Sequence, residues 1–274
     1  MSEKELERFK SLVNASAYLQ RLAVEEEFRK FCSQREMEYV THDRPWKEET
    51  LKKEGFIDIV AGYGIVRFVV ECKHPRSGGW IFLIHDNKQE TQRTRCHWVS
   101  YRNSSEDISG FDDFEIEPKS LESDACIIDS ESDNGRTQIG HTADNLLASA
   151  EHFAMEELLF LHNKQWKLSW PLVFIPVIVT TAHLYACVVD RRKISLTNAA
   201  VSEDNFQSVP MIRYRRNFSA KLISDHKPQS VAEAIKNRER SIIVMNTSHL
   251  SELLSQWNLR GPSFSGRFPW DSTQ

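Results

Sequence analysis

Residues 55–73 read Gly-Phe-Ile-Asp-Ile-Val-Ala-Gly-Tyr-Gly-Ile-Val-Arg-Phe-Val-Val-Glu-Cys-Lys. Two short apolar runs, 55–60 and 66–73, are rich in β-branched and aromatic residues and too short for helices. The residues between them, Ala61-Gly62-Tyr63-Gly64, are typical of a turn, so we expect a β-hairpin. Because successive side chains of a strand point to opposite faces, Glu71 and Lys73 should share one face while Cys72 points to the other.

The register of this hairpin can be predicted from the position of the turn. If the turn centres between Tyr63 and Gly64, Asp58 lies opposite Val69, on the face that also carries Glu71. The diagonal separation of the two acids is then roughly 7 Å between Cα atoms. A slip by one residue would send Asp58 to the other face. Two carboxylates and an amine at one sheet edge can hold a hard divalent cation and act on a water molecule, which indicates a metal-dependent nuclease.

The composition indicates a soluble globular protein of 274 residues, with 40% hydrophobic and 27% charged residues. With 35 Lys and Arg against 39 Asp and Glu, the net charge of -4 excludes a strongly basic nucleic-acid binder but allows a local basic groove. No apolar run reaches the roughly 20 residues needed to cross a bilayer, and the acidic N-terminus is unlike a signal peptide. Five dispersed cysteines suit a reducing compartment. We therefore expect a cytoplasmic protein with no membrane partner.

Helical and strand patterns alternate along the chain, which predicts an α/β protein with a mixed sheet. A helix is expected over residues 3 to about 38, with a break near Asn14-Ala15-Ser16. The other helices are expected at 144–162, 231–238 and 248–257, and the other strands at 80–84, 172–180, 184–189, 211–214 and 241–245.

Four segments lack such a pattern or allow two interpretations. Residues 43–46 are expected to be a loop, and residues 103–137 a long acidic loop with one short strand at 125–128. A cluster of cations and aromatics within residues 85–102 either contacts single-stranded nucleic acid or forms an ordinary surface loop. Its members are Arg93, Arg95, His97, Trp98 and Tyr101. Residues 213–216, Arg-Tyr-Arg-Arg, either contact phosphates or protect an edge strand.

A helix with glutamates, a strand with Asp58, a turn, a strand with Glu71-x-Lys73 and a later helix follow one another in the chain. This order resembles the PD-(D/E)XK nuclease superfamily, with Ile57 in place of the proline, over roughly residues 17–190. The resemblance implies one restriction-endonuclease-like domain, a mixed β-sheet flanked by helices. A C-terminal α/β elaboration at 191–260 and a flexible tail at 261–274 would complete it. The run from Ile175 to Tyr185 is also similar to prokaryotic defence-associated nucleases of this type.

The resemblance assigns roles to residues of this sequence. Asp58 and Glu71 would coordinate Mg²⁺ or Mn²⁺, and Lys73 would orient or deprotonate the attacking water. A glutamate of the first helix would support the metal; the apolar positions around it favour Glu25, with Glu27 as the alternative. His74 is either an additional ligand or base, or an incidental histidine.

The expected function is therefore that of a metal-dependent endonuclease. DNA rather than RNA is the expected substrate because most members of the resembled group cut DNA. The chain has no ATPase or recognition module, so a partner subunit or homo-oligomerisation, as in an antiviral defence system, would supply targeting. The alternative is a non-catalytic binding or assembly subunit that kept the fold; a nucleotide-binding sensor would need a Gly-rich phosphate loop, which the sequence lacks.

Overall fold

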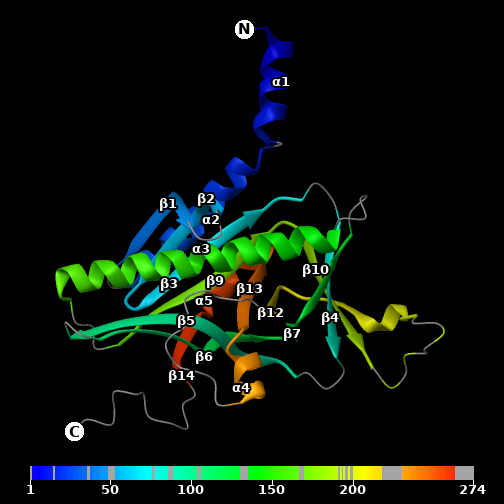
Figure 1. Cartoon of the computed structure of the whole chain (residues 1–274). Helices are drawn as coiled ribbons and strands as arrows, with labels where there is room; N and C mark the ends of the chain where they lie inside the picture. Colours follow the sequence, from blue (N-terminus) through cyan, green and yellow to red (C-terminus); the bar gives the residue numbers. More distant parts are fainter. Residues whose placement is uncertain are drawn as a thin grey trace.

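The computed structural model describes most of the chain (Figure 1). The described residues are 2–14, 16–35, 38–48, 53–75, 78–85, 89–103, 106–129, 135–166, 170–190, 192, 194, 197, 200–217 and 230–262. They form a mixed α/β structure built around a large mixed sheet flanked by helices. The α/β class and the mixed sheet are therefore confirmed.

Three consecutive strands open the large sheet. β1 (Tyr39–Glu48), β2 (Lys53–Tyr63) and β3 (Val66–Lys73) pair antiparallel in chain order. β9 (Leu172–Thr180) then pairs parallel to β3, and β13 (Glu239–Asn246) parallel to β9. Because these last three strands run in the same direction, their carboxyl ends meet at one edge of the sheet, and Glu71 and Lys73 lie near that edge.

The sheet continues beyond β13 through β12 (Met211–Asn217) to β7 (Glu122–Ser123). A long hairpin, β5 (Thr91–Asn103) and β6 (Glu106–Ser120), joins it through β9 and carries β14 (Asn258–Pro262) on its outer strand. A smaller sheet has the order β11-β10-β4-β8. Its strands are β4 (Gly79–His85), β8 (Ala125–Ile128), β10 (His183–Val189) and β11 (Phe206–Ser208).

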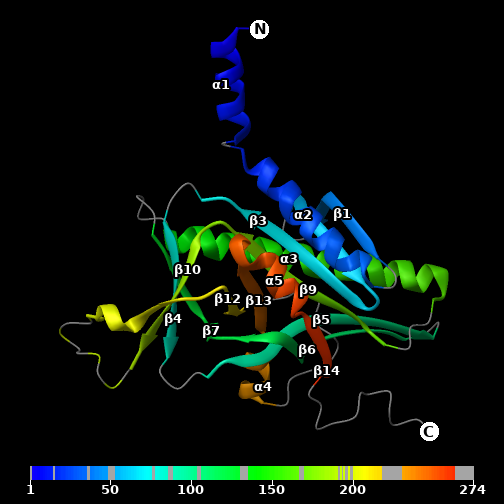
Figure 2. The same ribbon diagram turned by 180° about the vertical axis from the view of Figure 1, so that it is seen from behind.

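Helices cover both faces of the large sheet and enclose two apolar layers. α3 (Gly135–Lys164) lies across one face (Figure 1), while α2 (Ala17–Ser33) and α5 (Leu250–Ser255) lie on the other (Figure 2). β9 is buried along its whole length because both of its faces are covered. α1 (Glu3–Asn14) and α4 (Val231–Lys236) complete the helices of the described residues, with the short 3₁₀ turns Glu203–Asn205 and Thr247–His249. Among the described residues, no helix has the length and apolar character needed to span a bilayer.

The expected break in the first helix is confirmed, since α1 ends at Asn14 and α2 begins at Ala17. The strand expected at 172–180 matches β9, and the helix expected at 144–162 is part of the longer α3. The loop expected at 43–46 is wrong: these residues belong to β1, where Asp43 adopts a positive φ of 49°. The tail expected from 261 begins within β14, and residues 263–274 lie outside the described residues.

The long acidic loop expected at 103–137 is also wrong, because most of this segment is β-structure, although the short strand expected within it at 125–128 is confirmed as β8. β6, β7 and β8 occupy it, and α3 begins at Gly135. Phe114 and Ile116 are buried on one face of β6, while the acids between and beside them point away from the core. The period-two pattern of a half-buried strand is present, although its polar positions are almost all acidic.

The cationic and aromatic side chains of the cluster within residues 85–102 do not form an exposed surface. It belongs to β5, where Arg95, His97, Trp98 and Tyr101 are all buried. Only Arg93 of the five is exposed. Both interpretations of the cluster, a nucleic-acid contact and an ordinary surface loop, are therefore wrong.

The arginines of the basic run at 213–216 make structural contacts within the protein. Arg213 is fully buried and donates hydrogen bonds to Thr94 Oγ1 (2.8 Å) and Ser120 Oγ (2.6 Å), and to backbone carbonyl groups of the β5–β6 region. Burial lowers its pKa to about 10, so it remains a cation at neutral pH. Arg215 pairs with Glu122 at 2.6 Å and Arg216 with Asp144 at 2.9 Å. These arginines join β12 to neighbouring elements and are not available as a phosphate-binding row.

Candidate functional site at the carboxyl end of β3

The β2–β3 hairpin closes through a two-residue turn at Gly64-Ile65, where Gly64 has a φ of 48°. The ladder pairs Tyr63 with Val66 and ends with Ile59 opposite Val70. The expected register, with Asp58 opposite Val69, is wrong by two residues. Because a strand repeats every two residues, this shift leaves Asp58 at the same parity and moves it towards Glu71.

The carboxylate of Asp58 lies in the gap where the ladder between β2 and β3 stops. Its Oδ2 accepts a hydrogen bond of 2.7 Å from the backbone N–H of Cys72. That amide lies between the two residues of the Glu-x-Lys pattern, and Nζ of Lys73 is 2.6 Å from Oε1 of Glu71. The structure thus brings Asp58, Glu71 and Lys73 together at one end of the hairpin.

The electrostatic environment of Glu71 reflects this crowding. Burial raises the pKa of the Glu71 carboxyl group, the ammonium of Lys73 lowers it, and the charge of Asp58 raises it again. The net effect is a raised pKa. A cation placed between Glu71 and Asp58 would relieve both the burial of charge and the repulsion between the carboxylates, and would favour the ionised form.

Arg21 of α2 is a member of the site that sequence reasoning missed. Its guanidinium makes a two-point contact with Asp43 of β1, in which Nη2 is 2.9 Å from Oδ2, and Nη1 lies 3.9 Å from Oδ1 of Asp58. Asp43 was also missed because it was expected in a loop. The spacing could have predicted Arg21: it precedes Glu25 by four residues, so both residues lie on the helix face that packs against the sheet.

The structure distinguishes the glutamates of α2 by burial. Glu25 is 7% exposed, whereas Glu26 is exposed, as expected from the apolar stripe of the helix. Arg29 donates a hydrogen bond of 2.7 Å to Oε1 of Glu25, and Nδ1 of His42 lies 3.2 Å from Oε2 without forming a hydrogen bond. Glu27 pairs with Lys30 at 2.8 Å. Of the two candidates, Glu25 is the one whose side chain is buried, and its contacts are with Arg29 and His42 rather than with Asp58.

Polar groups from neighbouring elements complete the sheet edge. Gln20 of α2 donates from Nε2 to the carbonyl oxygen of Lys73 (3.4 Å), and Thr181, which follows β9, donates its N–H to the same oxygen (3.2 Å). His74 is exposed, and its Nδ1 lies 3.2 Å from Oγ1 of Thr181. Gln20 Oε1 is buried without a hydrogen-bond partner. Sequence reasoning missed Gln20 and Thr181 because each lies far along the chain from the hairpin.

The donor chemistry of the site suits a hard cation. Asp58 and Glu71 offer carboxylate oxygens, and Mg²⁺ is commonly bound through one or two carboxylates while it keeps several waters. Within the described part of the chain, no group of three or more His, Cys, Asp or Glu side chains is arranged to hold a metal ion. A metal here would therefore depend on two protein carboxylates, with water or a substrate phosphate as its other ligands.

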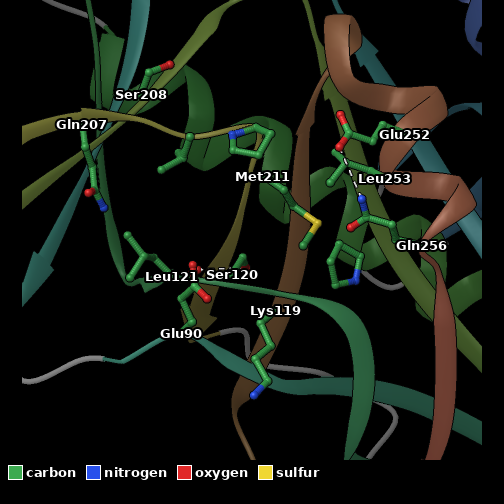
Figure 3. Close-up of a pocket in the computed structure, with 13 residues that line it drawn as sticks. Glu90, Lys119, Ser120, Leu121, Gln207, Ser208, Met211, Glu252, Leu253 and Gln256 are labelled. Carbon is green, nitrogen blue, oxygen red and sulfur yellow. Dashed lines mark hydrogen bonds between the residues drawn. The ribbon is translucent and has the colours of Figure 1, made fainter.

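A separate cavity of about 350 Å³ lies between the end of β6, the β11–β12 connection and α5 (Figure 3). Glu90, Lys119, Gln207, Glu252 and Gln256 supply polar groups to it, and Gln256 donates a hydrogen bond to Glu252 at 3.3 Å. It contains none of the predicted site residues.

Comparisons with protein-family models, with curated proteins and with solved structures gave no match for this chain. The site must therefore be interpreted from its own geometry. That geometry is two carboxylates and an amine at one sheet edge, with an arginine from the adjoining helix beside them.

Proposed function

We propose that this chain is a metal-dependent nuclease with a restriction-endonuclease-like fold, and that it hydrolyses phosphodiester bonds in DNA. One observation carries the proposal. The carboxylate of Asp58 is bound to the amide between Glu71 and Lys73, whose side chains are themselves in contact. The order of the observed elements also supports it: α2, the β2–β3 hairpin and, later, α3 follow the order of the resembled superfamily.

The residues of the site have distinct parts in such a reaction. Asp58 and Glu71 would hold Mg²⁺ or Mn²⁺, which supplies Lewis-acid activation of the phosphodiester and of a bound water. The ammonium of Lys73, held by Glu71 at 2.6 Å, would offset the negative charge that develops on the phosphate oxygens. Glu25 would act from α2 as a support, and the inward position of its side chain allows this.

A second function is favoured by a specific observation. Each carboxylate already has a cationic side chain near it, Lys73 beside Glu71 and Arg21 beside Asp58. Ion pairs of this kind also stabilise folds without binding any metal. The alternative is therefore a binding or assembly subunit that uses the same fold without catalysis.

The two functions are separated by a cleavage assay with purified protein. Plasmid DNA and an RNA of similar length are incubated with and without Mg²⁺, with the wild type, Asp58→Asn and Lys73→Gln. Glu54→Gln and Lys47→Gln are the matched controls, because they make the same chemical changes at exposed positions of β2 and β1. Thermal unfolding of each variant confirms that it is folded.

Metal-dependent cutting that is lost in both site variants and kept in both controls is the expected result. Equal cutting by all five proteins would assign the activity to a contaminant or another site. The wild type is also titrated with Mn²⁺ by calorimetry. If it neither cuts nucleic acid nor binds Mn²⁺, the nuclease proposal is wrong and the assembly subunit is favoured.

A further inference from the structure

We propose that the cavity beside α5 is a nucleobase-binding site, which holds a base of the nucleic-acid strand that is bound at Asp58 and Glu71. The inference rests on the proposed nuclease function and names a further contact of that enzyme with its substrate. The cavity, of about 350 Å³, lies between the end of β6, the β11–β12 connection and α5 (Figure 3). Its position, its polar groups and its charge each support the assignment.

The cavity lies at the same edge of the large sheet as the carboxylate site. In the pairing of β3, β9 and β13, Lys73 lies opposite Thr180, and Thr180 lies opposite Asn246. The backbone N–H of Asn246 donates a hydrogen bond of 3.0 Å to the carbonyl oxygen of Pro210, which lines the cavity. Three strand spacings of about 4.8 Å, or about 14 Å in all, therefore separate Lys73 from Pro210. At about 3.4 Å per nucleotide, this distance corresponds to about four steps of a stacked strand.

Hydroxyl and imidazole side chains follow the strands along this edge. His74 comes after β3, and its Nδ1 lies 3.2 Å from Oγ1 of Thr181, which comes after β9. Ser248 and His249 come after β13, and both are exposed, as is His74. Ligands of open α/β sheets bind outside the carboxyl ends of the strands, and hydroxyl and imidazole groups can donate hydrogen bonds to phosphate oxygens. A strand held at Lys73 can therefore follow this edge to the cavity.

The cavity combines buried apolar residues with exposed polar ones, as small-molecule sites commonly do. Met211 and Leu253 line it and are 3% and 5% exposed. Gln207 of β11 and Gln256, which follows α5, are exposed and bring amide groups to the cavity from opposite sides (Figure 3). Its volume of about 350 Å³ lies within the usual range for such sites.

Glu252 holds the amide of Gln256 in one orientation. Nε2 of Gln256 donates a hydrogen bond of 3.3 Å to Oε1 of Glu252, and the amide oxygen is on the side of Met211 (Figure 3). The carboxylate and this oxygen are acceptors, so the group that suits them is a hydrogen-bond donor. Adenine, cytosine and guanine carry an exocyclic amino group that donates, whereas thymine and uracil carry only carbonyl oxygens outside the ring. The cavity should therefore favour bases with an amino group.

The charge of the cavity favours a base over a phosphate. Among the described residues that line it, the ionisable side chains are those of Glu90, Lys119 and Glu252, which sum to a charge of -1 when ionised. A phosphate would be repelled, whereas a base is neutral at pH 7. The phosphates should therefore stay at the sheet edge while a base enters the cavity. A base of a duplex would first have to leave its stack, which costs free energy, so the site should favour unpaired strands.

The test is the binding of two labelled single strands of equal length, oligo-dC and oligo-dU, which differ in the amino group of each base. Fluorescence anisotropy is measured in Ca²⁺ in place of Mg²⁺, to limit cutting. The wild type should bind oligo-dC about tenfold more tightly, since a well-placed contact to a base discriminates by about this factor. Gln256→Leu should weaken the binding of oligo-dC about tenfold and leave that of oligo-dU unchanged. Gln34→Leu is the matched control, because Gln34 ends α2 as Gln256 ends α5 and lies outside the cavity.

Thermal unfolding confirms that each variant is folded. Equal binding of the two strands, or an oligo-dC affinity that Gln256→Leu does not lower, overturns the inference and leaves the nuclease proposal intact. If neither strand binds and no nucleic acid is cut, both the proposed function and this inference are wrong. Deoxycytidine alone is tested by calorimetry. If it binds the wild type but not Gln256→Leu, and neither strand binds, the cavity is a site for a free nucleoside and the contact with a strand is refuted.

Discussion

Replacing His97 of β5 should make the protein more resistant to acid. The imidazole is 4% exposed, stacks on Phe111 with ring centroids 4.5 Å apart, and has no hydrogen-bond partner at either ring nitrogen. Burial, assisted by the positive charge of Arg240, lowers the pKa of His97 to about 3. The folded chain therefore holds His97 neutral at pH values where an unfolded chain, with a histidine pKa near 6.5, binds a proton.

The size of the effect follows from this difference in proton binding. Below pH 6.5 the unfolded state binds one more proton than the folded state, so stability falls as the pH falls towards 3. The loss is about 1.4 kcal/mol for each pH unit. Because a histidine of the unfolded chain is only half protonated at pH 6.5, the wild type should lose about 2.3 kcal/mol more than a variant without this histidine between pH 6.5 and 4.5.

The assay is urea unfolding of the wild type, His97→Phe and His97→Leu at several pH values between 7.5 and 4.5. Only the difference in slope against pH is used, so a constant packing penalty in either variant does not affect the result. His141→Gln, at an exposed position of α3, controls for the loss of a histidine elsewhere. If the wild-type and His97 profiles stay parallel below pH 6.5, the imidazole is charged or solvated in the folded chain and the reasoning is refuted.

Three further substitutions test other parts of the structure. Arg213→Ala should cost about 4 kcal/mol in urea unfolding, because it leaves a cavity and several buried acceptors without a donor; a loss below about 1 kcal/mol would mean that these groups find other partners. Gly62→Ala should lower the free energy of unfolding by about 2 kcal/mol, because the new Cβ would lie 2.6 Å from a backbone oxygen. Gly140→Ala in α3 should raise the melting temperature, because alanine favours a helix more than glycine does and the nearest contact of its Cβ would be at 3.6 Å. If the metal site exists, Arg21→Gln should tighten Mn²⁺ binding about tenfold in calorimetry, because it removes a cation 3.9 Å from Asp58; unchanged affinity would place the metal elsewhere.

The β2–β3 hairpin shows which part of a site can be predicted from sequence. The alternation of side chains and the positions of Glu71 and Lys73 follow from a period of two, which is a property of the strand itself. The exact register depends on which two residues form the turn. The turn was expected at Tyr63 and Gly64, but Gly64 and Ile65 form it. Asp58 nevertheless lies on the same face of the hairpin as Glu71, because the error in register was two residues, which is one full period of a strand.

The β5–β6 hairpin shows where the same reasoning fails. Its strands carry charged residues at positions that a single sequence assigns to solvent, and Arg95 and His97 are nevertheless buried. Their burial depends on elements remote in the chain: Ser241 of β13 accepts a hydrogen bond from the amide of Arg95, and β9 pairs with β5 at His97. Contacts of such sequence separation cannot be inferred from local pattern, which is why this hairpin was expected to be loop.

The charge balance of the candidate site links metal binding to substrate binding. When ionised, the three carboxylates of Asp43, Asp58 and Glu71 and the two cations of Arg21 and Lys73 sum to a charge of -1. A divalent cation would change this to +1 in a partly buried place, which is unfavourable by itself. A phosphodiester, with one negative charge, would restore electrical neutrality and supply oxygen ligands that the protein does not. If the chain is the nuclease that we propose, metal and nucleic acid should therefore bind cooperatively, and the metal should bind weakly in the absence of substrate.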